Sequence, residues 1–269
     1  MTEGFYDLKE GRGAKIACVL PVFVPRGQIK SYTAWDENKL DTAKFTIAAH
    51  KYFKSGVAYD LIIVDNESPD PEARDFFKSL GAYRRINFGY SFGAWKWAWQ
   101  HFGNKYDFYL FTEDDIAPTR NSWLAEILTK YLSKPHIGAI GSFVEGRSRN
   151  ESMSELIWTL LGHDRDMIYN LDGSFVFTSS SVLSQIEIPL FDCSPGKFSP
   201  SVNEVVFVHP ILKLGYSIES YDDGIHLVIH GTEVFTGDIG RKWSRLAPLI
   251  NINARRIIPA INKVYEKLA

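Results

Sequence analysis

Short apolar runs alternate with stretches of helical periodicity through the first half of the chain. A continuous apolar run of four to eight residues bounded by turn residues is typical of a buried strand, and apolar positions three and four apart indicate a helix. The expected strands are residues 15–24, 59–64, 83–87 and 107–112, and the expected helices are residues 33–53, 71–80 and 92–102. This alternation predicts a single α/β domain of the Rossmann-like kind, with a mostly parallel sheet flanked by helices.

The second half has a less regular pattern. Residues 192–201 hold two prolines, a glycine and three serines, which predicts a loop. The expected helices are residues 122–132, 181–186 and 204–214, and the expected strands are residues 137–143, 175–178 and 225–229. From residue 241 onward the chain is basic and its pattern is helical, which predicts a C-terminal tail (241–269) after a domain at 15–240 and an N-terminal arm at 1–14.

Composition narrows the class of protein. The chain has 269 residues, 45% of them hydrophobic, and a formal net charge of -2, which gives no support to nucleic acid as the main partner. Cys18 and Cys193 are too few for a disulfide framework. No apolar run approaches the roughly 18 residues of a membrane span. We therefore expect a cytoplasmic protein, with peripheral contact at the membrane left open.

Acidic side chains follow the strand expected at 107–112. Glu113, Asp114 and Asp115 are adjacent, and a hard divalent cation would relieve the repulsion between their carboxylates. The alternative is an acidic turn that caps the next helix, which alone is the commoner explanation of such a triplet. Asp65 ends another expected strand, and there too ligand contact competes with a local Asx turn to Ser68 and Asp70.

An ordered series of segments favours the metal site over the capping turn. It resembles the glycosyltransferases of the GT-A fold, above all the large inverting family known as family 2, over about residues 15–232. The matching segments are Leu20-Pro21-Val22-Phe23, Val64-Asp65-Asn66-Glu67-Ser68-Pro69-Asp70, Asn87-Phe88-Gly89, Glu113-Asp114-Asp115, Asn203-Glu204 with Leu214-Gly215-Tyr216, and His230-Gly231-Thr232.

The resemblance implies transfer of a sugar from a nucleotide-diphosphate sugar, UDP-linked by default, to a hydroxyl of a glycan or glycolipid, as in polysaccharide biosynthesis. It implies a nucleotide-sugar-binding half at 15–118 and an acceptor-binding half at 119–240. The implied cofactor is Mn²⁺ or Mg²⁺. The implied general base is Glu204, the implied metal ligands are Glu113, Asp115 and His230, and the implied donor contacts are Pro21, Phe23, Asp65, Asn87, Gly89 and Asp114.

The chain departs from the family pattern at three places. Glu113 replaces the first Asp of the metal motif, which leaves Asp115 as the expected ligand and Asp114 facing donor or solvent. Asn203-Glu204 replaces a Glu-Asp pair, and Pro210 stands near the place of the usual arginine. His226 precedes His230 by four residues and would share its strand face.

Several alternatives stay open from the sequence. They are a retaining transferase of the same fold, a non-catalytic sugar-binding or scaffold relative, and, ranked lower, a nucleotidyltransferase. Lys96, Arg84 and Arg85 could reach a phosphate, although a solvated surface is the expected role for at least two of the three. The tail at 241–269 could pack on the domain, mediate a homodimer or lie on an anionic membrane.

Overall fold

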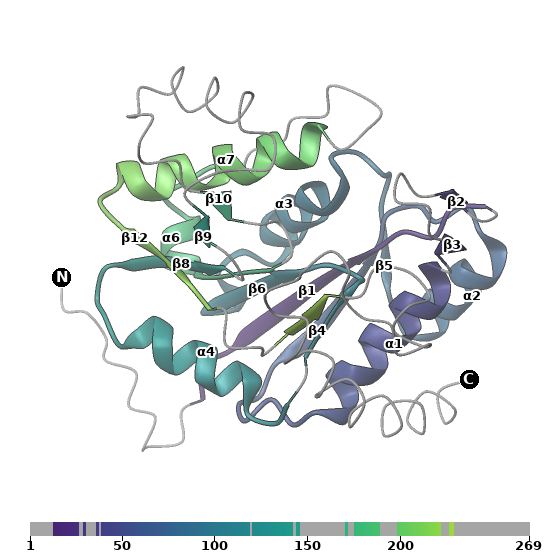
Figure 1. Cartoon of the computed structure of the whole chain (residues 1–269), viewed down its shortest axis with the longest axis horizontal. Helices are drawn as coiled ribbons and strands as arrows, with labels where there is room; N and C mark the ends of the chain where they lie inside the picture. Colours follow the sequence, from purple (N-terminus) through teal and green to yellow (C-terminus); the bar gives the residue numbers. More distant parts are fainter. Residues whose placement is uncertain are drawn as a thin grey trace.

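A seven-stranded sheet forms the centre of the computed structural model, which describes residues 13–26, 29–30, 36–37, 39–118, 120–141, 144–145, 170–171, 175–188, 198–221 and 226–228 (Figure 1). Its order is β12-β8-β11-β6-β1-β4-β5, and only β11 runs antiparallel to its neighbours. The strands are β1 (Ile16–Val22), β4 (Asp60–Asp65), β5 (Tyr83–Arg84), β6 (Phe108–Thr112), β8 (Ile137–Gly141), β11 (Phe175–Ser179) and β12 (Ser217–Ser220). The predicted mostly parallel sheet is therefore confirmed.

Helices cover both faces of this sheet. They are α1 (Lys39–Tyr52), α2 (Pro71–Ser79), α3 (Tyr90–Phe102) with the 3₁₀ turn η1 (Gly103–Lys105), α4 (Trp123–Leu132), α6 (Ser180–Leu183) and α7 (Phe198–Lys213). Strand side chains alternate between faces. Cys18 of β1 packs in the core under α1 and α4, whereas Val19 packs in the core under α3, α6 and α7 (Figure 1). The parallel strands β1, β6 and β8 are buried throughout, which is why their sequences are almost continuously apolar.

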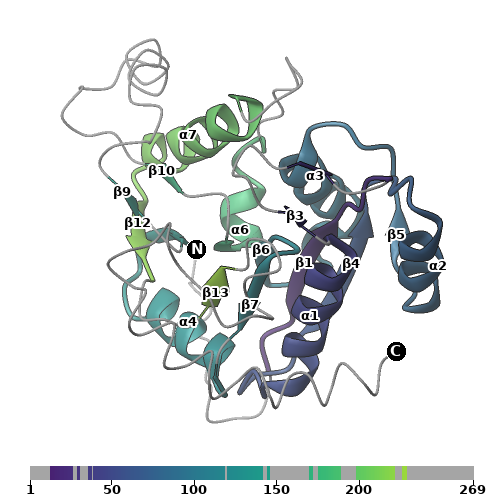
Figure 2. The same cartoon turned by 45° about the vertical axis from the view of Figure 1, so that its right-hand side comes forward.

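Three short antiparallel ladders lie outside the main sheet. They pair β2 (Ile29–Lys30) with β3 (Asp36–Glu37), β9 (Val144–Glu145) with β10 (Asn170–Leu171), and β7 (Ile116–Pro118) with β13 (His226–Val228). The last of these places the end of the described chain beside the segment that follows β6 (Figure 2).

Two predicted helix starts were wrong. The helix expected from residue 33 begins at Lys39, because residues 36–37 pair with β2 and long-range pairing leaves no mark in helical periodicity. The helix expected from residue 204 begins at Phe198, inside the predicted loop. Pro200 is its third residue, where the missing N–H would have no intrahelical partner in any case, so proline does not oppose a helix there.

None of the described helices is both long enough and apolar enough to cross a membrane. The basic tail at 241–269 and its predicted membrane or dimer contacts lie outside the described residues, as does Cys193. The predicted domain limits at residues 14 and 240 stay predictions.

Candidate functional site

The strand order creates a divergence point at the centre of the sheet. From β1, the chain goes to β4 and β5 on one side and then to β6 on the other, and all four strands are parallel. In open α/β sheets, ligands bind outside the carboxyl ends of the strands at such a switch point. Here the residues at that edge are Phe23 after β1, Asp65 at the end of β4, and Glu113-Asp114-Asp115 after β6.

A hydrogen bond joins the two sides of the switch point. The backbone N–H of Phe23 donates to Oδ2 of Asp114 over 3.3 Å. Both residues are partly buried and both were predicted as donor contacts. Pro21, the third predicted contact of this segment, is buried within β1 opposite Val64, so its position is that of a core residue.

The three carboxylates after β6 have different surroundings. Oε1 of Glu113 accepts a hydrogen bond of 2.7 Å from the hydroxyl of Ser91, in the first turn of α3. A carboxylate near a helix N-terminus is stabilised by the helix dipole. The Glu113 side chain thus has a partner within the protein, at the start of α3. The Asp114 carboxylate accepts from Phe23, and the Asp115 side chain is only 6% exposed.

The backbone of this cluster forms a tight turn, since the N–H of Ile116 donates to the carbonyl of Glu113 over 3.1 Å. The turn leads into β7, and the next helix begins at Trp123, so the alternative explanation of the triplet as a helix cap does not hold. Within the described part of the chain, no three His, Cys, Asp or Glu side chains are grouped so that they could hold a metal ion. Glu113 and Asp115 therefore stay predicted ligands.

Asp65 forms the predicted Asx turn. Its Oδ1 accepts from the N–H of Ser68 over 2.8 Å, and the Ser68 hydroxyl accepts from the N–H of Val24 over 3.0 Å. Oδ2 of Asp65 accepts from Nη1 of Arg84 over 2.5 Å. Asp70 instead caps α2, because its carboxylate accepts from the N–H of Ala73. The local interpretation of Asp65 is confirmed, and its contact with a donor stays a prediction.

Arg85 connects three segments of the same edge. Its Nη1 donates to Oδ1 of Asn66 over 2.6 Å and its Nη2 donates to the carbonyl of Phe88 over 2.7 Å. Asn66 in turn donates from Nδ2 to the carbonyl of Tyr90 over 3.3 Å. Partial burial lowers the pKa of Arg85, yet a guanidinium keeps its charge in proteins. The arginine thus ties the end of β4 to the start of α3.

A surface position, as expected for at least two of Lys96, Arg84 and Arg85, fits Arg84, whose side chain is 40% exposed, and Lys96, which pairs with the exposed Glu187, yet all three side chains have partners within the protein. Arg84 and Arg85 bind Asp65 and Asn66, and Lys96 pairs with Glu187 over 2.7 Å. Sequence reasoning missed the two arginines as positioning residues. The signal was a basic pair within the strand predicted at 83–87 and an Asp-Asn pair directly after the strand predicted at 59–64.

The segment before α3 lies against the helix with very little space. Gly89 is buried and has φ +76°, a conformation that favours glycine. A Cβ at Gly93 would come within 1.9 Å of the Phe88 carbonyl oxygen, so this position admits no side chain. The positive φ explains Gly89 and close packing explains Gly93, and the predicted donor roles of Asn87 and Gly89 stay predictions.

Two elements from the second half approach the acidic cluster. The rings of Phe92 in α3 and Phe207 in α7 contact at 6.2 Å, and Phe92 directly follows Ser91, the partner of Glu113. Glu204 lies in α7 one turn before the buried Val208, and its side chain lies outside the described part.

In the second of these elements, β13, Val228 pairs with Ile116, the residue after Asp115, and His226 pairs with Pro118. His230, two residues beyond Val228, lies outside the described residues.

No protein-family model matches the chain, and no curated protein matches it in sequence. Solved structures share its fold. A glucosyl-3-phosphoglycerate synthase from Mycobacterium tuberculosis in complex with Mn²⁺ and uridine-diphosphate-glucose superposes with a TM-score of 0.52 at 15% identity, covering 94% of this chain and 80% of that one. The same enzyme in complex with Mn²⁺, UDP and glucosyl-3-phosphoglycerate gives 0.53 at 16% identity, covering 94% and 81%.

A mannosyltransferase from Pyrobaculum calidifontis in complex with GDP-Man and Mn²⁺ also superposes, with a TM-score of 0.51 at 12% identity, covering 96% of this chain and 74% of that one. The chain therefore has the fold of nucleotide-sugar glycosyltransferases, and the predicted GT-A type fold is confirmed.

Proposed function

We propose that the protein is a glycosyltransferase that moves a sugar from a nucleotide-diphosphate sugar to a hydroxyl of a glycan or glycolipid. The observation that supports this proposal most directly is the switch point between β1 and β6. There the backbone of Phe23 donates a hydrogen bond to Asp114, the middle residue of the acidic cluster. Its support from outside the chain is the shared fold with enzymes seen in complex with Mn²⁺ and UDP-glucose or GDP-Man.

The chemistry of the cluster fits a hard divalent cation. Glu113, Asp114 and Asp115 offer oxygen donors, which Mg²⁺ and Mn²⁺ prefer. The described residues form no three-ligand group, but Mg²⁺ is commonly held by one or two carboxylates together with substrate phosphates. We assign Asp115 as the main protein ligand, with His230 as a further one. When bound, the ion supplies positive charge for the departing diphosphate.

The protein's own groups would then position the donor. The Asp65 turn and the Phe23 backbone border the place where a nucleotide would lie, and Arg84 and Arg85 fix Asp65 and Asn66. A ribose hydroxyl can donate to a carboxylate such as that of Asp65. The Asn87–Gly89 segment forms the neighbouring wall, because Gly93 allows it to lie directly on α3.

We assign Glu204 as the general base of an inverting transfer. Removal of the acceptor hydroxyl's proton needs one carboxylate near the anomeric carbon. The position of Glu204 supports this, since α7 packs on α3 through Phe207 and Phe92, next to the partner of Glu113. Product stereochemistry tests the role: retention of the anomeric configuration would remove it from Glu204 and indicate a retaining enzyme.

The test of the proposed function is a thermal-shift series with UDP, GDP and dTDP, each with and without Mn²⁺, followed by assay of the matching nucleotide sugars for hydrolysis or transfer. Binding to the folded state raises stability by an amount set by ligand concentration over Kd. We expect one nucleotide to stabilise the protein in a Mn²⁺-dependent way. Asp115→Asn, which keeps the shape of a buried side chain, should abolish this, and the exposed Asp75→Ala on α2 should not.

If no nucleotide stabilises the protein, the donor site is wrong. If a nucleotide binds with Mn²⁺ but none of its sugar conjugates turns over with any acceptor or with water, the protein is a non-catalytic relative of the fold. Mn²⁺-dependent binding that survives in Asp115→Asn would move the metal away from Asp115.

A further inference from the structure

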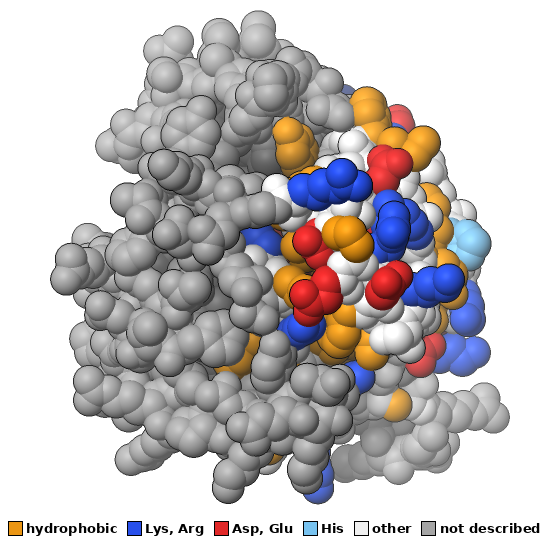
Figure 3. All heavy atoms as spheres, turned by 90° about the vertical axis from the view of Figure 1, so that its right-hand side faces the viewer, with side chains coloured by type: hydrophobic (Ala, Val, Ile, Leu, Met, Phe, Trp, Pro, Cys, Tyr) orange, Lys and Arg blue, Asp and Glu red, His pale blue; other side chains and the backbone are white. Residues whose placement is uncertain are grey.

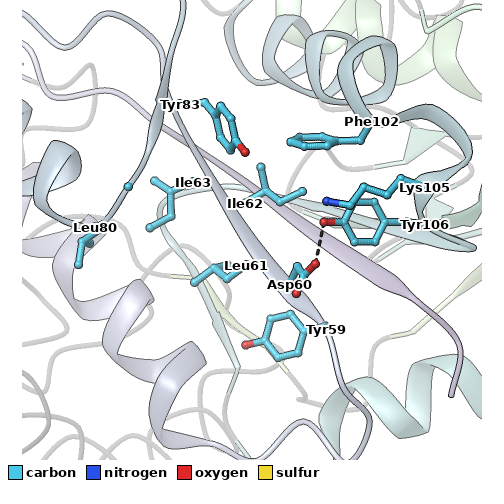
Figure 4. A pocket seen from close by; sticks show the side chains of 11 residues that line it. Tyr59, Asp60, Leu61, Ile62, Ile63, Leu80, Tyr83, Phe102, Lys105 and Tyr106 are labelled. Atoms are coloured by element: carbon cyan, nitrogen blue, oxygen red, sulfur yellow. Dashed lines mark hydrogen bonds between the residues drawn. The ribbon is translucent and has the colours of Figure 1, made fainter.

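A second pocket lies at the outer edge of the sheet, away from the carboxyl ends of the strands (Figure 4). Strand β5 pairs only with Val64 and Asp65, so the preceding part of β4, residues 60–63, forms the floor of an open-edged hollow of about 410 Å³. That volume is within the range of roughly 300–1,000 Å³ found for small-ligand sites. The side chains important for recognition are Asp60, Tyr83, Phe102, Lys105 and Tyr106.

Aromatic rings form one side of this pocket. The Tyr83 side chain is 41% exposed, and its ring lies near Phe102 at 5.5 Å, Trp97 at 5.4 Å and His101 at 5.7 Å. These contacts hold the ring in place while leaving part of it open to a ligand. In Figure 4, Tyr83 and Phe102 lie side by side across the pocket from Asp60. An aromatic surface that is both fixed and exposed is suited to binding rather than to core packing.

Polar groups of opposite charge, Asp60 and Lys105, also line the pocket. The Tyr106 hydroxyl donates to Oδ2 of Asp60 over 2.7 Å, and burial with this hydrogen bond raises the pKa of Tyr106, so it remains a donor at neutral pH. The Lys105 ammonium lies 5.2 Å from the Tyr106 ring centroid and 5.5 Å from that of Phe102. The pocket thus presents an acceptor carboxylate and a donor ammonium with no net charge.

We propose that this pocket binds a neutral sugar residue, and that it anchors a glycan at a distance from the transfer site. Sugars present C–H faces that lie on aromatic rings and hydroxyls that both donate and accept, which matches the exposed Tyr83 ring together with the carboxylate of Asp60 and the ammonium of Lys105. The carboxylate of Asp60 disfavours phosphate, and the described surface on this side of the molecule carries both acidic and basic side chains (Figure 3).

This proposal rests on the proposed function, because a glycan bound here would be the acceptor or the product of the transfer. The pocket would hold a sugar unit of that glycan other than the one that reacts. Asp60 and Asp65 are the two ends of β4. At about 3.3 Å per residue, Asp60 lies roughly 16 Å from Asp65 along β4, whereas Tyr83 pairs with Val64, the residue before Asp65, so the pocket extends along the strand toward the donor edge. A ligand that reached from Asp60 to the donor edge would have to contain several sugar units, so the proposal is tested with oligosaccharides.

The test is binding of the full-length protein to a microarray of oligosaccharides that contains neutral glucan, mannan and galactan chains, followed by titration of the best ligand. We expect at least one neutral glycan to bind. Tyr83→Ala should weaken it about tenfold or more, because it removes the exposed ring, whereas Tyr83→Phe should stay within about twofold. The matched control is Tyr52→Ala, a tyrosine of equal exposure (42%) at the end of α1.

Absence of any neutral glycan on the array would overturn the proposal, as would binding that Tyr83→Ala leaves unchanged. Binding of a zwitterionic dipeptide such as Ala-Ala in place of glycans would also overturn it, since such a ligand would use Asp60 and Lys105 without the rings. The nucleotide series with Mn²⁺ is run on Lys105→Ala, which should lose glycan binding and keep nucleotide binding. Failure of the pocket is thereby distinguished from failure of the donor site.

Discussion

The backbone N–H of Phe23 donates to the carboxylate of Asp114 over 3.3 Å, although 91 residues separate them in the sequence. This contact connects the segment after β1 with the segment after β6 at the switch point of the sheet. Asp114 therefore has a role within the protein before any ligand binds. The acidic cluster is better described as a turn with three separate carboxylate environments than as a preformed metal cage.

Two substitutions of Asp114 separate its role as a hydrogen-bond acceptor from the contribution of its charge. Asp114→Ala removes the acceptor of the Phe23 N–H and should lower the free energy of unfolding by about 1 kcal/mol. Asp114→Asn keeps an acceptor oxygen and should cost less than half as much. Urea denaturation measures both. Equal losses in the two variants would show that charge, and not the hydrogen bond to Phe23, is what the position needs.

Substitution of Arg84 should lower the stability of the fold, because it leaves the buried carboxylate of Asp65 without its charged partner. The Asp65 side chain is 4% exposed, and Arg84 is its charged partner. Arg84→Met should destabilise the fold by about 2 kcal/mol, because an unpaired buried acceptor loses its hydration without compensation. The double variant Arg84→Met with Asp65→Asn should recover part of that loss. Additive effects of the two changes would contradict an energetic coupling between them.

Gly93→Ala should disrupt the wall of the donor site. Its Cβ would approach the Phe88 carbonyl to 1.9 Å, so the Asn87–Gly89 segment must move or the helix must shift. We expect a loss of about 1–3 kcal/mol in unfolding free energy, as for overpacked sites, together with weaker nucleotide binding. Gly13→Ala is the control, since nothing lies within 4 Å of its added Cβ. Unchanged stability in Gly93→Ala would mean that this close approach does not persist in solution.

His50 should make the protein sensitive to acid. Its ring is buried against Trp123 at 5.3 Å and Tyr59 at 6.2 Å, and burial lowers its pKa from 6.5 to about 3. Between these values the unfolded chain binds a proton that the folded chain does not. Stability is therefore full above pH 6.5 and falls as the pH decreases toward 3, by about 2 kcal/mol at pH 5.

Urea titrations at pH 7.5 and pH 5 measure this effect. In His50→Gln the difference in unfolding free energy between pH 7.5 and pH 5 should be smaller by about 2 kcal/mol. This holds even if the substitution lowers stability at both pH values. His101→Gln, which changes an exposed histidine of α3, should leave the difference as in the wild type. A wild-type pH dependence that persists unchanged in His50→Gln would assign it to other groups.

Much of the fold follows from the sequence because its signals are local. The apolar run that ends at Asp65 and the one that ends at Thr112 are strands within a residue of their predicted ends, and α2 begins at Pro71 as predicted. Burial on both faces makes such strands continuously apolar, and a proline at the first turn suits a helix start. The meeting of Asp65 and the acidic cluster at one edge also follows, since parallel strands end together.

The tertiary structure decided what these polar groups touch. β12 joins the main sheet although three of the four residues in Ser217–Ser220 are polar, because it pairs with β8, a strand that is distant in the sequence. Arg84 and Arg85 were expected at a solvated surface, yet they bind Asp65 and Asn66. Glu113 stays a predicted metal ligand, and only the folded structure shows that it also accepts a hydrogen bond from Ser91. The sequence determines where carboxylates and cations occur along the chain. Which of them pair depends on strand order, because electrostatic interaction depends on the distance between charges in the folded protein.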